Sequence, residues 1–261
     1  MNRGRWCTFV LGFLAGCAST PGVPPGAVSA KPPPKTIQGV VLCADGAGGF
    51  GWTTEALQYT AAEKQIPIHV EMFDWSHGWG RMITDNCHWS HTKRKGQELA
   101  RMVQRVRTER PELEVFLIGH SAGCAVVLQS CKDLPANSVE RIVLLAPSVS
   151  PGYDLRPALA CSRLGIDAFI SRRDWVTLGM TMRVFGTTDR RWTAGAGQVG
   201  FQLPDNTPET KQLYAKLREH VWEPTEAETG NKGGHYGSYV PGYLRSKILP
   251  LLTPTGAQAS R

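Results

Sequence analysis

The chain has 261 residues, of which 41% are apolar and 20% are charged, and its formal net charge is +7. This length and apolar content suffice for one globular domain with a buried core, and they exclude a disordered chain and a fibrous protein. The basic residues are spread along the sequence, and the compact run KRK at 93–95 is typical of a solvated helix start, so we expect no nucleic-acid partner.

The N-terminal segment has the features of an export signal. Arg3 and Arg5 precede an apolar run at 7–16, which is shorter than the roughly 20 apolar residues that span a bilayer. The motif Leu-Ala-Gly-Cys, ending at Cys17, resembles the bacterial lipobox. The resemblance implies a signal peptide over residues 1–16, lipidation of Cys17, and membrane attachment in the bacterial cell envelope, as an outer-membrane lipoprotein. An ordinary secretory signal that is cleaved nearby is the alternative.

A proline-rich segment follows the predicted signal. Residues 21–35 contain six prolines and almost no large apolar side chains, so they favour extended backbone and cannot form a core. We therefore interpret residues 17–36 as a tether, residues 37–255 as the globular domain and residues 256–261 as a flexible tail.

From residue 37 onward, short apolar runs alternate with longer segments of helical period. Near-continuous hydrophobicity is typical of parallel strands that are covered on both faces, and it occurs at 36–43, 66–73, 113–119, 141–147 and 166–171. The helical period predicts helices at 52–65, 92–109 and 122–133. This alternation indicates βαβ units, and it predicts an α/β fold with a mostly parallel central sheet and helices on both faces.

The last part of the sequence is less regular. We expect loops with room for one strand at 183–207, a helix running into a strand at 208–222, and an interrupted closing helix at 239–252. The connection between residues 147 and 166 is too short for a separate cap domain.

The motif Gly-His-Ser-Ala-Gly at 119–123 lies between an apolar strand and a predicted helix. This arrangement is typical of a nucleophile elbow, in which small flanking residues allow a strained turn that exposes the serine, here Ser121. A turn whose glycines serve packing alone is the alternative. With the Gly-rich turn after the first strand and a late histidine, the chain from 37 to about 252 resembles the α/β-hydrolase superfamily. The resemblance implies a serine-acid-histidine triad in that order.

Two histidines follow Ser121 and could act as its base. His235 lies in the Gly-rich loop NKGGHYGSY and is favoured over His220, which lies inside a predicted helix or strand. Asp174 is the favoured acid because it follows the strand at 166–171, where the superfamily carries its acid. Asp189 is the alternative acid, and Asp167 is weaker because it lies within the strand.

Acyl transfer also requires hydrogen-bond donors for the oxyanion that develops during the reaction. We expect the N–H of Ala122, which follows the serine, and the N–H of Ala47, in the turn after the first strand. The superfamily often has His-Gly in that turn, whereas this chain has Asp45-Gly46. A plain Gly-rich turn is the alternative.

The segment at 73–93 is rich in aromatic residues and histidines. Its tryptophans Trp75, Trp79 and Trp89 are expected on the active-site side of the sheet, as a substrate wall or a small lid. Plain packing of the loop is the alternative for this segment.

A metal site in the same segment would need His88 and His91 with Asp85 or Cys87. These residues lack a convincing fourth ligand, so we expect no metal and no cofactor. The five cysteines that follow the predicted lipidation site are odd in number, so spacing alone assigns no disulfide; they are Cys43, Cys87, Cys124, Cys131 and Cys161.

Together these residues predict a serine hydrolase that acts on small-molecule or lipid carboxylic esters, as an esterase or lipase. Ser121 is the expected nucleophile, His235 the base and Asp174 the residue that orients the base. A thioesterase, amidase or acyltransferase with the same triad is an alternative, because substrate choice lies in the shape of the loops. A membrane-anchored binding protein that keeps the fold without catalysis is another.

Overall fold

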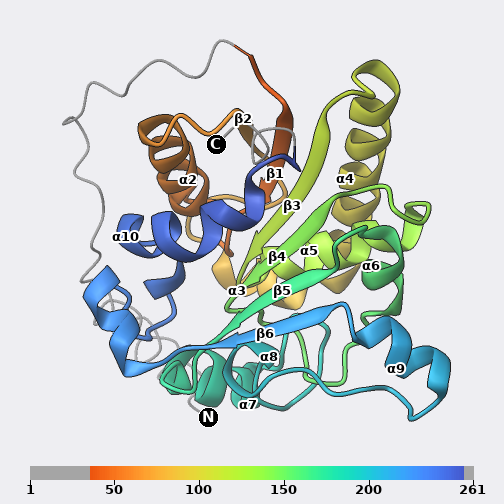
Figure 1. The fold of residues 1–261 in the computed structure, drawn as a ribbon. Coiled ribbons are helices and arrows are strands. Elements are labelled where there is room, and N and C mark those ends of the chain that lie inside the picture. The colour runs from red at the N-terminus through yellow and green to blue at the C-terminus, as the bar shows by residue number, and fades with distance from the viewer. Residues whose placement is uncertain (1–35, 256–261) are drawn as a thin grey trace, which may run out of the picture.

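The computed structural model describes residues 36–255 (Figure 1). The predicted signal, Cys17, the predicted tether except its last residue, and the tail at 256–261 lie outside the described residues. Within 36–255, no helix combines the length and the apolarity that a membrane span requires. All five cysteines in this part of the chain are free thiols.

A six-stranded parallel sheet forms the centre of the molecule, which confirms the predicted fold class. Its strands are ordered β2-β1-β3-β4-β5-β6. They are β1 (Gly39–Ala44), β2 (Ile68–Met72), β3 (Glu114–His120), β4 (Arg141–Leu145), β5 (Ile166–Ile170) and β6 (Leu217–Val221). The sixth strand follows a helix within 208–222, as the sequence predicts.

Helices cover the two faces of the sheet. The longer ones match the predicted segments: α2 (Trp52–Glu63), α4 (Trp89–Glu109) and α5 (Gly123–Ser130). Shorter α-helices are α3 (Met82–Cys87), α6 (Arg156–Cys161), α7 (Met182–Phe185), α8 (Ala196–Val199), α9 (Pro208–Tyr214) and α10 (Pro241–Tyr243). Within 183–207 the structure has short helices and no strand. The prediction that this segment has room for one strand is therefore wrong.

Several helical turns have other hydrogen-bond patterns. Two are π-helical, Trp175–Thr181 and Leu244–Ile248, and four are 3₁₀, namely Cys131–Asp133, Pro224–Thr229, Gly237–Tyr239 and Leu249–Leu252. The predicted closing helix at 239–252 is therefore a chain of short turns.

Alternate residues of each strand pack on opposite faces of the sheet. On β1, Leu42 belongs to the core under α4, α5 and α6, whereas Val41 belongs to the core under α2 and the C-terminal turns. Figure 1 shows these two helical layers on either side of the sheet. Because both faces of the inner strands are buried, β1, β3 and β4 are apolar along most of their length.

The direction in which the chain builds the sheet reverses between β1 and β3. After β1 the chain forms the edge strand β2 and then returns to the other side of β1 as β3. In open α/β sheets, the crevice outside the carboxyl ends of the strands at such a point holds the ligand. The turn after β1 and the turn after β3 meet there, and the β4–β5 connection carries only the short α6, with no cap domain among the described residues.

Candidate active site

Ser121 lies at the tip of a sharp turn between β3 and α5. Its φ of 52° is in the left-handed region, which a residue other than glycine adopts only at a cost of about 1–3 kcal/mol. The two motif glycines are required by close contacts. A Cβ at Gly119 would lie 2.7 Å from Cys124 Cα, and a Cβ at Gly123 would lie 2.1 Å from Ala44 O. The glycines thus let β3, α5 and β1 approach one another closely enough to form the turn.

The structure brings Ser121, His235 and Asp174 together from three distant parts of the chain. His235 Nε2 lies 2.9 Å from Ser121 Oγ, and His235 Nδ1 lies 2.5 Å from Asp174 Oδ2. Because a carboxylate only accepts, Nδ1 carries the proton and Nε2 presents its lone pair to the serine hydroxyl. All three side chains are largely buried, with residue exposures of 8%, 8% and 3%. This arrangement can remove a proton from Ser121.

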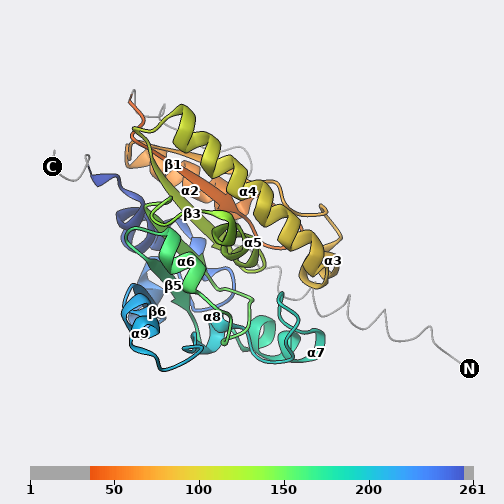
Figure 2. The same ribbon diagram turned by 90° about the vertical axis from the view of Figure 1, so that its right-hand side faces the viewer.

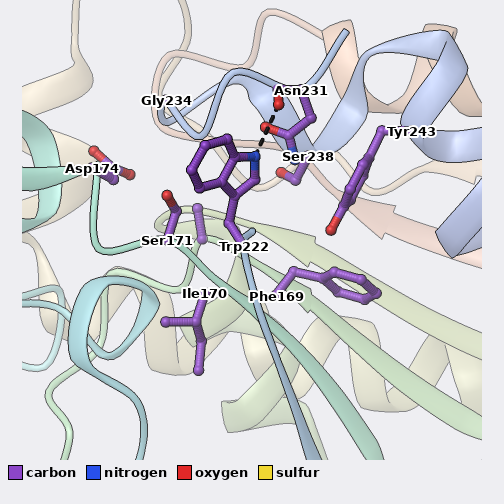
Figure 3. A pocket seen from close by; sticks show the side chains of 10 residues that line it. Phe169, Ile170, Ser171, Asp174, Trp222, Asn231, Gly234, Ser238 and Tyr243 are labelled. Atoms are coloured by element: carbon purple, nitrogen blue, oxygen red, sulfur yellow. Dashed lines mark hydrogen bonds between the residues drawn. The ribbon is translucent and has the colours of Figure 1, made fainter. Parts of the chain in front are cut away.

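Two hydrogen bonds hold the part of the loop that precedes His235. Ser171 Oγ donates to Gly233 O at 2.6 Å, and Trp222 Nε1 donates to Asn231 O at 2.9 Å. Figure 3 shows the Trp222 indole next to Asn231 in a small cavity that Asp174 also lines. Trp222, which directly follows β6, therefore connects the histidine loop to the sheet beside Asp174.

The alternative acid and base have other partners. Asp189 accepts from Ser150 N at 2.8 Å and from Thr187 Oγ1 at 2.6 Å, so it fixes the connections after β4. His220 Nε2 lies 2.7 Å from Asp167 Oδ1. Burial acts to raise the pKa of Asp167, but hydrogen bonds from His220, Arg218 and Arg141 lower it well below its usual range. Asp167 and His220 thus belong to an ionic cluster across the sheet.

The motif histidine, His120, lies beside the three residues and is fully buried. Its Nε2 donates to His235 O at 3.2 Å. Burial, and secondarily the nearby His235, lower the pKa of His120 to about 3. A Cβ at Gly46 would lie 2.9 Å from His120 Nδ1, so only glycine lets the turn after β1 pack against this neutral ring.

That turn, residues 45–49, is held by two buried carboxylates. Asp45 accepts from Thr53 N at 2.8 Å and from Thr54 Oγ1, which attaches the turn to the start of α2. Asp85 Oδ2 accepts from Gly48 N at 2.7 Å. Asp45, which stands where the superfamily often has histidine, thus anchors the turn.

The expected oxyanion donors lie on the two turns that flank the serine. Ala122 is the residue before α5, and Ala47 lies in the turn after β1. Within residues 36–255, neither N–H has an intramolecular acceptor, so both are free to bind an oxygen atom. At Gly46 a Cβ would lie 3.6 Å from Ser121 Cβ, which puts this turn directly beside the serine.

The three tryptophans of the segment at 73–93 do not form one wall. Trp75 is 1% exposed, and its Nε1 donates to Asp45 O at 2.7 Å. The prediction that Trp75 lines a substrate wall is therefore wrong. Trp89 packs partly against the core, and Trp79 is 84% exposed. Burial of Trp75 could not be read from the sequence, because it follows from how the loop folds back under the turn after β1.

A second group of apolar side chains, which the sequence did not indicate, is exposed in the segment that follows Asp174. It comprises Trp175, Met180, Val184, Phe185 and Trp192. Figure 2 shows α7 of this segment at the same end of the molecule as α3, and Thr188 Oγ1 lies 3.4 Å from Asn86 Oδ1. The two segments thus meet at the carboxyl end of the sheet.

The histidines of the segment at 73–93 come together, although the sequence led us to expect no metal. One ring nitrogen from each of His77, His88 and His91 lies within 4.8 Å of the others. The spacing of His88 and His91 was visible in the sequence, but the return of His77 to them was not.

Part of this chain matches a known protein family. The model of a family described as serine aminopeptidase, S33, matches residues 35–181. This match covers more than half of the chain and includes the serine turn and Asp174. No curated protein matches the chain.

Among solved structures that are similar to this chain, one supports the fold. The Thermus thermophilus protein TT1662 is 14% identical, with a TM-score of 0.51, over 85% of this chain and 92% of that chain. A cutinase-like protein from Cryptococcus is 12% identical, with a TM-score of 0.42, over 85% of this chain and 98% of that one. A cutinase from Trichoderma reesei is 16% identical, with a TM-score of 0.33, over 54% of this chain and only 60% of the cutinase.

Proposed function

Because the chain belongs to the serine aminopeptidase S33 family of α/β-hydrolases, we propose that it is a serine hydrolase that cleaves carboxylic esters. The observation that carries this proposal is the continuous contact from Ser121 Oγ through His235 to Asp174, at 2.9 Å and 2.5 Å. A serine hydroxyl becomes a strong nucleophile when a base accepts its proton, and this base has its tautomer fixed by a carboxylate.

In the proposed reaction, Ser121 Oγ attacks the ester carbonyl while His235 Nε2 takes the hydroxyl proton. The N–H groups of Ala47 and Ala122 donate to the oxyanion of the tetrahedral intermediate. His235 then gives its proton to the leaving alcohol, and the acyl group stays on Ser121. A water molecule, deprotonated by His235, releases the acid and restores the serine.

Esters with an apolar acyl chain are the proposed substrate class. The exposed side chains Trp175, Met180 and Phe185 lie in the segment that follows Asp174, and exposed apolar side chains near a reactive site suit an apolar ligand. Cleavage of a lipid ester would use the same surface.

The family description names an aminopeptidase, and the buried carboxylates speak against that activity here. An aminopeptidase needs an anionic group for the substrate ammonium. Within residues 36–255, the buried carboxylates all accept from protein donors; they are Asp45, Asp85, Glu140, Asp167 and Asp174. Each of them thus already has a partner within the protein.

We also propose that the protein is exported and anchored to the bacterial outer membrane through lipidated Cys17. This proposal rests on the lipobox-like motif and on the prolines of the tether. The intact mass of protein from a bacterial envelope would show a diacylglyceryl group on Cys17. A mature chain that begins elsewhere and carries no lipid contradicts the anchor and leaves the hydrolase unaffected.

Substrate class is tested with three parallel series on the same protein: p-nitrophenyl esters of increasing chain length, the matching thioesters, and aminoacyl p-nitroanilides. We expect the highest kcat/KM for esters, rising with chain length as the acyl group covers more apolar surface. Ser121→Ala is the control for turnover from other sources. Higher kcat/KM for the anilides would assign the aminopeptidase activity instead.

A further inference from the structure

Three imidazoles from separate turns meet beside the turn after β1. His77 lies in the loop after β2, His88 between α3 and α4, and His91 in the first turn of α4. Ring centroids are 3.9 Å apart for His77 and His91, and 5.3 Å apart for His77 and His88. His91 is buried, His77 is half-buried and His88 is exposed. The cluster thus opens to solvent on one side.

Two of the three rings have their tautomers fixed by acceptors that lie behind them. His77 Nδ1 donates to Asp85 Oδ1 at 2.8 Å, which leaves a lone pair on Nε2. His91 Nε2 donates to the carbonyl oxygen of Trp75 at 2.6 Å, which leaves a lone pair on Nδ1. Metal-binding histidines are almost always oriented in this way, by a carboxylate or a backbone carbonyl on the second nitrogen.

The distance between the third ring, that of His88, and the ring of His77 suits two ligands of one metal ion. His88 Nδ1 lies 3.4 Å from His77 Nε2, which is long for a hydrogen bond. Two nitrogens that bind zinc tetrahedrally, each at about 2.0–2.1 Å from the ion, are about 3.3–3.4 Å apart. The separation therefore fits two ligands of one metal ion better than it fits a donor and an acceptor.

We propose that His77 Nε2, His88 Nδ1 and His91 Nδ1 bind one divalent transition-metal ion of the zinc class. Three neutral imidazoles favour zinc, cobalt, nickel or copper over magnesium and calcium, which prefer oxygen ligands. The fourth position faces solvent beside the exposed His88 and takes a water molecule. Asp85 and the carbonyl of Trp75 are positioning groups that orient the ligands.

One neighbouring residue competes with the metal. Arg94 Nη2 lies 2.8 Å from His91 Nδ1 and donates to the lone pair that the metal would use. The Arg94 side chain is 62% exposed, and its Nε is already 3.8 Å from Glu98. It can therefore turn outward to Glu98 when the ion binds. Both its hydrogen bond and its positive charge oppose metal binding.

The site would also support the turn beside Ser121. Asp85, which holds His77 through Oδ1, holds Gly48 N through Oδ2 at 2.7 Å. A metal on His77 would therefore restrain the α3 segment and the turn after β1 as one unit. The metal proposal does not depend on the proposed ester hydrolysis, because its readout is binding.

The test is cobalt and zinc binding to full-length, tag-free protein after treatment with a chelator. We expect one equivalent of Co²⁺ with a visible absorption band, displaced by Zn²⁺. His77→Asn, His88→Asn and His91→Asn should each weaken binding by at least about tenfold, and His69→Asn, at an exposed histidine on β2, should leave it unchanged. His88→Asn is decisive, because this exposed side chain can be replaced without loss of the fold.

Arg94→Ala gives a gain-of-binding test. It should tighten metal binding several-fold, because it removes a competing donor and a nearby positive charge. Thermal unfolding should show a metal-dependent rise in the midpoint that is lost in His88→Asn. The proposal is overturned by the absence of saturable binding in folded protein, or by binding that persists in the three histidine variants.

Discussion

Asp85 and Gly48 are joined by a hydrogen bond of 2.7 Å that connects α3 to the turn after β1 across 37 residues of sequence. The same carboxylate accepts from Ser76 Oγ and from the backbone N–H of His77. One buried group thus fixes both the turn that is proposed to hold the oxyanion and the loop that carries the histidine cluster.

Asp85→Asn should therefore affect catalysis and stability together. The amide has one acceptor oxygen where the carboxylate has two, so some of these donors lose their partner. We expect the free energy of unfolding in urea to fall by about 1–3 kcal/mol. We also expect kcat to fall by roughly tenfold to a hundredfold with little change in KM, because the oxyanion exists only in the reaction. Asp154→Asn, at an exposed pair with Arg156, is the control and should change neither.

The tight packing around the serine turn predicts that Gly123 tolerates no side chain. In Gly123→Ala the new methyl would lie 2.1 Å from Ala44 O and 2.4 Å from Asp45 O, and backbone atoms cannot move aside cheaply. We expect a loss of about 3 kcal/mol or more in the free energy of unfolding. Gly152→Ala, where a Cβ meets nothing within 4 Å, should stay within about 0.5 kcal/mol of the wild type. Equal stability of the two variants would show that the turn is not packed as described.

Two matched substitutions show whether Asp174 or Asp189 is the catalytic acid. Asp174→Asn keeps the shape of the side chain but favours the wrong tautomer of His235, so kcat for an ester should fall by about 10⁴-fold. Asp189→Asn weakens the contacts with Ser150 and Thr187, so it should lower stability while kcat changes less than about tenfold. Circular dichroism shows whether each variant is folded. Loss of turnover only in Asp189→Asn would assign the acid to the other residue.

Burial of His120 makes stability depend on pH. Its pKa is about 3 in the folded protein and has an ordinary value of 6.5, since burial and His235 oppose its charge while Asp174 favours it. Between these values the unfolded chain binds a proton that the folded chain does not. The contribution of His120 to stability is therefore complete above pH 6.5, is lost as the pH falls, and stops changing below about pH 3.

The measurement is the free energy of unfolding at pH 7 and at pH 4.5. His120→Gln should lose less stability between these pH values than the wild type does, because the glutamine does not titrate. The exposed residue His69 supplies the control, and His69→Gln should follow the wild type. Carboxylates that titrate in the same window contribute equally to all three proteins. The same pH dependence in all three would show that His120 is not buried as a neutral ring.

Much of the fold could be predicted because both faces of the sheet are buried. Strands such as β3 and β4 are buried after their first residue and are mostly apolar, and this makes them visible in the sequence. The edge strand β6 alternates half-buried and exposed residues, so it could be read only as part of a helix that runs into a strand. The segment at 183–207 depends on loop contacts, such as those of Asp189, that leave no periodic pattern.

The site could be predicted in part for a related reason. Ser121 lies in a local motif whose glycines have a local steric cause, and Asp174 and His235 occupy turns next to predictable elements. The burial of Trp75 and the meeting of His77 with His91 depend on how one loop folds back on itself. No spacing in the sequence indicates that the loop folds back in this way. The sequence therefore led us to predict a substrate wall of tryptophans and gave no indication of the histidine cluster.

Ser121 is the proposed nucleophile, and reaction with a fluorophosphonate followed by peptide mass spectrometry tests this role directly. We expect one adduct per folded chain, on Ser121, with loss of ester turnover in proportion to labelling. Ser121→Ala should take up no label, and Ser148→Ala, at a buried serine bonded to Thr188, should be labelled like the wild type. Folded protein that takes up no label would contradict this assignment and favour a binding protein with this fold, whereas a label on another residue would contradict it by placing the nucleophile there.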